Sequence, residues 1–151
     1  AYFLQFYRKA QMSGNPIFHK IYKKLFEIFA KKKGIEFSVD NEIGYGFYVG
    51  HPYGITINAK AIIGNNVNIH KGVTIGQENR GKRKGTPCIG NNVWIGVNAT
   101  IVGNVVIGND VLIAPNTYIN CDIPDHSIVF GNPCIVKHAD DATKDYINHA
   151  V

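Results

Sequence analysis

Hydrophobic residues return at every sixth position through most of this chain. Phe37, Ile43 and Val49 open the pattern. Ten isoleucines then keep the step, with one interruption: Ile57, Ile63, Ile69, Ile75, Ile89, Ile95, Ile101, Ile107, Ile113 and Ile119. A period of six matches neither an amphipathic helix nor the simple alternation of a strand. It favours short strands separated by tight corners.

The positions between the isoleucines fit such corners. A small or apolar residue follows most isoleucines at the fourth position, as Ala61 follows Ile57. Polar pairs occupy the corners, where Asn and Asp tolerate left-handed backbone angles. These pairs are Asn65-Asn66, Asn91-Asn92 and Asn109-Asp110. Three six-residue sides would close a coil of about 18 residues, and stacked coils bury an aliphatic column. The sequence therefore predicts an all-β solenoid over residues 35–137.

The two ends of the chain depart from the repeat. Residues 1–34 are predicted to form an N-terminal helical segment, in which Asn15 is a helix N-cap, Pro16 the first helical residue and Gly34 the stop. The helix expected to begin at Pro16 carries an apolar stripe, followed by basic residues in the last turn: Ile17, Ile21, Leu25, Ile28 and Phe29, then Lys31, Lys32 and Lys33. We expect this stripe to cap the open end of a β-helix rather than to lie on a membrane. Residues 138–151 form a C-terminal tail that is predicted to contain a short helix.

Two interruptions break the register. Eight residues instead of six lead from Val49 to Ile57, and the surplus carries His51. The second interruption is a loop predicted at residues 77–87, which must leave the coil. Irregular backbone on a rigid scaffold is where sites usually lie. One coil separates His51 from His70, so we expect the two imidazoles to lie close together, with the base of the loop beside both.

His51 is the candidate catalytic residue. A neutral imidazole can take the proton of a hydroxyl that attacks a carbonyl or thioester, which accelerates the reaction by roughly 10²–10⁴. It does this best beside a carboxylate that fixes its tautomer. Glu36, Asp40 and Glu42 each precede His51 by about one coil, and the periodicity does not choose between them. We expect His70 to support the site rather than to react.

Composition narrows the function classes. The chain of 151 residues has a formal net charge of +5, which suits an anionic ligand, a nucleic acid or an acidic membrane surface. It has no apolar run near the roughly 18–20 residues of a membrane span and does not open on a signal peptide. Cys88, Cys121 and Cys134 form no CxxC motif. We therefore expect reduced thiols in a cytoplasmic protein.

The six-residue pattern has an aliphatic residue first, Gly or Ala often second, and a small residue fifth. In this it resembles the repeat of the hexapeptide-repeat acyltransferases, from about residue 36 to 137, and the resemblance implies a left-handed parallel β-helix. The segments IGYGFYVGHPYGI (43–55), NVNIHKGVTIG (66–76) and TPCIGNNVWIGVNATIVGN (86–104) are similar to the catalytic domain of serine O-acetyltransferases. They are most similar to the short forms found in bacterial polysaccharide clusters. The resemblance implies direct acetyl transfer from acetyl-CoA, with His51 as catalytic base and Glu36 as its carboxylate partner.

The same resemblance implies a homotrimer with active sites between adjacent subunits. Acetyl-CoA would lie at that seam, in contact with the following residues: Gly76, Gln77, Gly96, Val97 and Pro115, with Lys137 near the phosphates. Val97, Pro115 and Pro133 are spaced by eighteen residues and are expected to stack as one column.

The residues implied for the acceptor are Gly50, Arg80, Arg83 and Thr86. Gly50 stands where the long enzymes of the family carry an aspartate. Those enzymes also carry an Arg-His pair before the proline of the loop, and Gly85-Thr86 takes the place of that pair here. Arg80 or Arg83 would then replace the missing arginine, since the loop is long enough to fold back.

Several alternatives stay open. Without the ion-pairing residues of a serine site, the acceptor could be a sugar hydroxyl, and Tyr45, Tyr48 and Tyr53 around His51 would suit the face of a sugar ring. A γ-class carbonic anhydrase shares the fold but needs three histidines. No third histidine occurs in the repeat before His126, so no metal is expected. The remaining class is a non-enzymatic scaffold or membrane-docking module. A nucleic-acid partner is not expected, since the short basic loop lacks interleaved aromatics.

Overall fold

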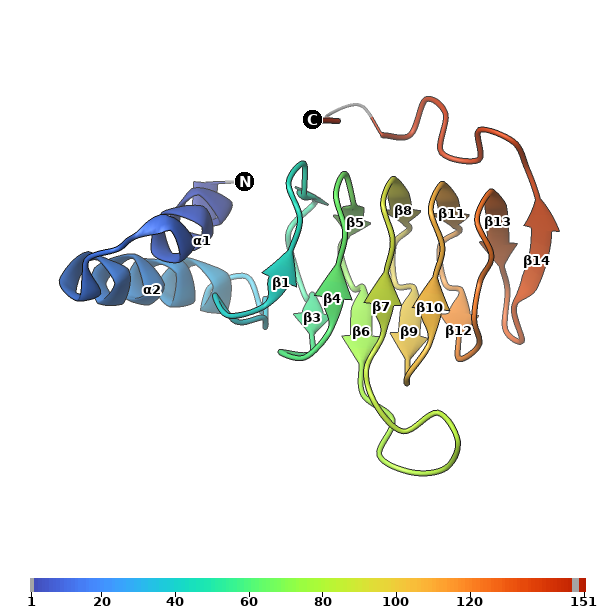
Figure 1. Cartoon of the computed structure of the whole chain (residues 1–151), viewed down its shortest axis with the longest axis horizontal. Helices are drawn as coiled ribbons and strands as arrows, with labels where there is room; N and C mark the ends of the chain where they lie inside the picture. Colours follow the sequence, from blue (N-terminus) through green and yellow to red (C-terminus); the bar gives the residue numbers. More distant parts are fainter. Residues whose placement is uncertain (1, 148–149) are drawn as a thin grey trace.

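A computed structural model describes residues 2–147 and 150–151 of the chain. Its strands wind into a prism whose three sides are sheets of parallel strands (Figure 1). Side 1 contains β1 (Glu42–Ile43), β4 (Ile62–Ile63), β7 (Cys88–Ile89) and β10 (Val106–Ile107). Side 2 contains β2 (Tyr48–Gly50), β5 (Asn68–His70), β8 (Val93–Ile95), β11 (Val111–Ile113) and β13 (Ser127–Phe130). Side 3 contains β3 (Thr56–Ile57), β6 (Thr74–Gly76), β9 (Thr100–Val102) and β12 (Tyr118–Ile119).

The isoleucines of the six-residue step point into the prism and form its core. Ile69, Ile75 and Ile95 are fully buried, and burying each such side chain stabilises the fold by roughly 1.5–3 kcal/mol. Strand pairing brings Ile95 beside Ile113, eighteen residues later. The predicted β-solenoid is therefore confirmed, and it is consistent with the left-handed form that the repeat implies.

The polar corners between sides 1 and 2 also follow the prediction. Asn66, Asn92 and Asp110 have φ angles of 56°, 53° and 53°. The residue before each of them accepts a hydrogen bond across to the coil below. For example, the Asn91 side-chain oxygen accepts from the Asn65 amide at 2.8 Å. Asn and Asp therefore serve these corners twice, through their tolerance of positive φ and through their side-chain oxygens.

Besides the coil that carries the loop between β6 and β7, the coils at the two ends of the prism depart from the regular length. β1 pairs with β4 twenty residues later, because two residues are added near His51. β11 pairs with β13 only sixteen residues later. Extending that register by two residues puts Gly131 beside Pro115. The column expected from Val97, Pro115 and Pro133 is therefore wrong at its last member.

Two helices, α1 (Tyr2–Met12) and α2 (Pro16–Lys31), close the end of the prism at β1 (Figure 1). Asn15 caps α2 as predicted, because its side-chain oxygen accepts from the amides of Ile17 and Phe18. Phe26 of α2 packs on Phe37 of the first coil, with ring centroids 5.1 Å apart. Among the described residues, neither helix has the length and apolar character needed to cross a membrane.

The face of α2 that packs is not the predicted one. Phe26 and Ala30 are buried, whereas Ile17, Ile21 and Ile28 of the expected stripe are 69%, 46% and 41% exposed. Apolar residues occur around much of the circumference of this helix. Periodicity alone could therefore not identify the side that meets the prism.

The chain turns back after β14 (Ile135–His138), which pairs antiparallel with β13. No helix forms among the described residues beyond β14, and the short C-terminal helix expected there is replaced by turns over residues 140–146. We call residues 139–147 the C-terminal strap, which returns along the prism (Figure 1). Asp110 holds the strap by accepting hydrogen bonds from the amides of Ala142 and Thr143, both at 2.9 Å. Local helix propensity carries no information about this distant anchor.

Candidate active site

The first interruption widens the corner between β2 and β3. His51 has a φ of 51° there, a left-handed conformation that is uncommon for a residue with a side chain. Two hydrogen bonds fix the corner. The Tyr53 amide donates to the His51 carbonyl oxygen at 2.8 Å, and the Gly72 amide donates to the Tyr53 carbonyl oxygen at 3.0 Å. The His51 side chain is exposed outside the aliphatic core.

His70 lies close to His51, as the coil length predicts. β2 pairs with β5 so that Gly50 lies beside His70, and the two imidazole centroids are 6.4 Å apart. Burial, and then the neighbouring His51, lower the pKa of His70 below its usual 6.5, so His70 is neutral near pH 7. Its Nε2 atom is buried and has no hydrogen-bond partner in the described part of the chain.

Sequence analysis missed two aromatic residues that cover His70. The Trp94 ring lies 4.8 Å from the His70 ring, and Tyr146 of the C-terminal strap meets Trp94 at 5.0 Å, edge to face. Trp94 directly precedes Ile95, so the six-residue step already places it on the outer face of side 2. Tyr146 lies beyond the repeat, and no sequence signal points to it.

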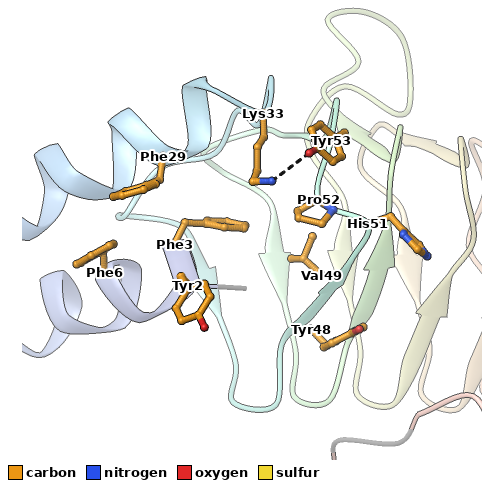
Figure 2. A pocket seen from close by; sticks show the side chains of 10 residues that line it. All are labelled: Tyr2, Phe3, Phe6, Phe29, Lys33, Tyr48, Val49, His51, Pro52 and Tyr53. Carbon is orange, nitrogen blue, oxygen red and sulfur yellow. Dashed lines mark hydrogen bonds between the residues drawn. The ribbon is translucent and has the colours of Figure 1, made fainter.

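A cavity of about 830 Å³ lies between the helices and the widened corner. Its walls are mostly aromatic and come from both helices and the first coil: Tyr2, Phe3, Phe6, Phe29, Tyr48, Val49, Pro52 and Tyr53. Lys33 completes the wall, and its ammonium donates to the Tyr53 hydroxyl at 3.3 Å. Figure 2 shows the His51 ring at the edge of this cavity and directed away from the helices.

The structure separates the three candidate carboxylates. Glu36 forms a parallel bridge with Thr56 on side 3, beside the strand that follows His51, and its side chain is exposed. Asp40 instead lies 3.9 Å from the Lys23 ammonium, and Glu42 lies on side 1. No hydrogen bond joins Glu36 to His51 within the described residues.

The loop leaves the prism at a different corner. It connects β6 on side 3 to β7 on side 1, whereas His51 lies between sides 2 and 3. Arg83 pairs with Asp122 of the same chain at 3.0 Å, and the Thr86 hydroxyl donates to the Lys60 carbonyl oxygen at 3.2 Å. The structure thus does not bring the loop to His51 and His70 within one chain, contrary to the expectation.

Three residues expected to meet acetyl-CoA lie at the same corner of the prism as His51, in later coils. Gly96, Val97 and Pro115 all follow the side 2 strands, as His51 does. A Cβ atom on Gly96 would lie 2.7 Å from the Pro115 nitrogen. The coils therefore touch at this point, and only glycine fits.

The other expected contacts lie apart from that column. Gly76 and Gln77 stand at the opposite edge of side 3, where the Gln77 side-chain nitrogen donates to the Asn79 side-chain oxygen at 2.7 Å. Lys137 is exposed on β14, with its ammonium 5.7 Å from the centroid of the Phe130 ring.

The histidines considered for a metal site do not converge. His126 bonds to Asp110 at 2.7 Å, at a corner between sides 1 and 2. In the described part of the chain, no three His, Cys, Asp or Glu side chains group in a way that could hold a metal ion. Cys121 and Cys134 are free thiols with their sulfur atoms 3.9 Å apart.

Comparison with known proteins gives a consistent result. The family model described as bacterial transferase hexapeptide (six repeats) matches residues 89–121. A serine acetyltransferase from Helicobacter pylori is 32% identical over 126 residues, which cover 83% of this chain and 74% of that enzyme. Serine acetyltransferase 2 from Arabidopsis thaliana is 33% identical over 139 residues, which cover 83% of this chain and 41% of the plant enzyme.

Solved structures agree over the helices as well as the prism. A serine acetyltransferase from Neisseria gonorrhoeae superposes with a TM-score of 0.73 at 26% identity, over 95% of this chain and 57% of that one. Isoform 3 from Entamoeba histolytica, solved in complex with cysteine, gives 0.68 at 30% identity, over 95% of this chain and 50% of that one. The chain thus spans about half of these structures. By its repeat, its fold and its identity to the Helicobacter enzyme, the chain belongs to the serine acetyltransferase family.

Proposed function

We propose that this chain transfers the acetyl group of acetyl-CoA to a hydroxyl, with His51 as the general base. The observation that supports this most is the exposed imidazole on a widened corner, at the head of the column that continues over Gly96 and Pro115. An exposed imidazole can accept a proton near neutral pH.

The reaction needs no acyl-enzyme. His51 takes the proton of the acceptor hydroxyl as its oxygen attacks the thioester carbonyl. The carbon–sulfur bond then breaks, the acetyl group stays on the acceptor oxygen, and the CoA sulfur leaves with the proton that the imidazolium returns. Glu36 is the carboxylate that stabilises the imidazolium, and its bridge to Thr56 supports this role over Asp40 and Glu42.

Acetyl-CoA lies along the corner column in this proposal. Its pantetheine arm passes Gly96, Val97 and Pro115, where small or rigid residues leave the backbone open to hydrogen bonds. Gly76 and Gln77 flank the arm. Lys137 offers a cation to the phosphates, since it is exposed and makes no ion pair in the described structure.

The active unit is a homotrimer in this proposal. His51 and the loop occupy different corners of one prism, so prisms packed side by side would bring the loop of one copy to the His51 corner of the next. Gly50, Arg80, Arg83 and Thr86 would then meet the acceptor together. Free thiols and the use of acetyl-CoA favour the cytoplasm as the location.

Serine is the acceptor that the names of the relatives suggest. A sugar hydroxyl is the second candidate, and one observation favours it. The described wall of the cavity beside His51 holds several aromatic rings and no carboxylate, while a serine ammonium would need an anion there.

A thiol-release assay with acetyl-CoA tests the proposal. Serine, homoserine and a panel of sugars serve as acceptors, with the wild type, His51→Asn and the matched control His138→Asn, which alters an exposed histidine on β14. We expect His51→Asn to lose roughly 10²–10⁴ of the rate and the control to lose none. Wild-type turnover by His51→Asn would remove His51 from the mechanism, and a response to serine alone would end the sugar alternative.

A further inference from the structure

The helix α2 has two apolar faces, and only one of them is covered. Phe26 and Ala30 are buried toward α1 and the prism, while Ile17, Ile21 and Ile28 remain exposed. We call these three residues the exposed stripe. Their spacing of four and then seven residues puts them on one side of the helix, opposite the buried pair.

Lysines run along one edge of the exposed stripe. Lys20, Lys24 and Lys31 lie three or four positions from Ile17, Ile21 or Ile28, which makes them neighbours on the helix surface. None of the three makes an ion pair or a side-chain hydrogen bond in the described structure. Glu27 is the one acidic residue of α2.

The charge of the whole chain is concentrated at this end. Residues 1–34 hold eight of the sixteen Lys and Arg residues but one of the eleven Asp and Glu residues, which gives the segment a net charge of +7. The remaining residues carry eight basic and ten acidic side chains, for a net charge of −2. Figure 1 shows the two helices projecting beyond β1, away from the rest of the prism.

We propose that this surface docks on an anionic lipid bilayer. The axis of α2 would lie in the plane of the interface, with the exposed stripe below the headgroups and Lys20, Lys24 and Lys31 against the lipid phosphates. Apolar residues flanked by cations are the pattern that binds helices to such surfaces. The helices close the prism with their other face, so capping and docking do not compete.

Two other occupants fit the surface less well. A second copy of the chain would bring the lysines of both copies together, with one glutamate on each copy to offset them. A helix of about 24 Å also offers one narrow stripe, whereas a stable dimer buries about 800 Å² on each partner. Nucleic acid would pair with the lysines but would leave the isoleucines in water.

Vesicle flotation tests the proposal, with bilayers of neutral phosphatidylcholine and bilayers that also contain about 30% phosphatidylglycerol. We expect the wild type to float with the anionic vesicles, to detach at high salt, and to ignore the neutral ones. Ile17→Ser/Ile21→Ser and Lys20→Gln/Lys24→Gln should each weaken binding about tenfold or more. The matched control is Lys82→Gln/Lys84→Gln, which removes the same charge from the exposed loop and should bind as the wild type does.

Each contrary outcome is distinct. Equal binding by Ile17→Ser/Ile21→Ser and wild type would overturn the proposal, and so would the absence of wild-type binding to anionic vesicles. Sedimentation velocity without lipid provides the second measurement, since a smaller oligomer for the isoleucine variant would assign the stripe to a second copy. The substituted residues are exposed, so thermal unfolding of all variants should match the wild type. The test measures lipid binding alone, so its result does not depend on whether the chain transfers acetyl groups.

Discussion

At the scale of single residues, Gly50 and His70 share one small space at the widened corner. A Cβ atom on Gly50 would lie 2.5 Å from Nδ1 of His70. We expect Gly50→Ala to lower the free energy of unfolding by about 1–3 kcal/mol, because the ring must move against Trp94. Urea unfolding measures this.

Gly14→Ala is the control for that substitution. Nothing lies within 4 Å of its added Cβ, so its free energy of unfolding should stay equal or rise by about 0.4–1 kcal/mol. In a His70→Ala background the cost of Gly50→Ala should shrink, since the clash is removed. An unchanged cost there would mean that the imidazole is not what excludes the methyl group.

Glu36 provides the second prediction at this scale. If it steadies the His51 imidazolium, Glu36→Gln should lower kcat at least about tenfold while the KM for acetyl-CoA stays near the wild-type value. Glu42→Gln makes the same chemical change on side 1 and should leave kcat unaltered. Equal losses in the two variants would mean that net charge, and not the position of Glu36, determines the rate.

The sequence could locate His51 because a strict repeat makes an insertion visible. It could also place His70 one coil away, and the ring separation of 6.4 Å agrees. It could not find Tyr146 or the lining of the cavity by α1, because these residues reach the corner through contacts between distant parts of the chain. A repeat predicts the register of its own coils but not which distant segments of the chain pack against them.

At the scale of elements, the C-terminal strap depends on Asp110. Burial of this carboxylate opposes its ionisation, but hydrogen bonds from Thr143, His126 and Ala142 outweigh that effect and lower its pKa from 3.8 to about 2. A carboxyl whose pKa is lower in the folded state stabilises the fold above the unfolded pKa and ceases to do so as pH falls through the folded one. The contribution should therefore be complete above about pH 5 and disappear between about pH 4 and 2.

Asp110→Asn tests this reasoning. At pH 7 the variant should unfold more easily by about 2 kcal/mol, the worth of hydrogen bonds to a charged group. Urea unfolding repeated down to about pH 2 should show the two proteins converging. Asp145→Asn, on the same segment but exposed, should follow the wild type throughout. A gap between wild type and Asp110→Asn that persists at low pH would contradict the ionic origin of the effect.

The element that misled the sequence analysis was α2. Its cap at Asn15 and its first residue follow from local chemistry and agree with the structure, although the helix ends at Lys31, before the stop expected at Gly34. Its buried side depends on where α1 and Phe37 lie, which no local pattern records. The C-terminal turns also depend on a distant contact that no local pattern records. The amides of Ala142 and Thr143 donate to the Asp110 carboxylate instead of to carbonyl oxygens of a helix.

At the scale of the whole molecule, the prism separates the two interruptions of its repeat. The sequence made them look adjacent, because both break the same step within two coils. In three dimensions a coil has three corners, and His51 and the loop take different ones. Completing one site from both features requires two copies of the chain, and this makes the proposed trimer testable by mixing.

Complementation between two inactive variants tests the trimer. The first variant is His51→Ala. The second replaces residues 79–84 by Asn-Gly, a turn suited to the antiparallel bridge between Glu78 and Gly85. If each site takes its base from one copy and its loop from the next, both homotrimers are inactive. In an equal mixture that is unfolded and refolded together, half of the copies carry an intact His51 and the other half carry an intact loop. About one quarter of the sites then combine an intact His51 with an intact loop from the next copy.

Thiol release from the mixture should therefore reach about a quarter of the wild-type rate. A mixture of His51→Ala with Glu36→Gln is the control. Both residues belong to the same corner of one chain in the proposal, so no hybrid contains an intact pair and the rate should stay at the level of the separate variants. Recovery in the control but not in the loop mixture would mean that base and carboxylate come from different copies. No recovery in either mixture, with trimers confirmed by sedimentation, would mean that each chain builds its site alone.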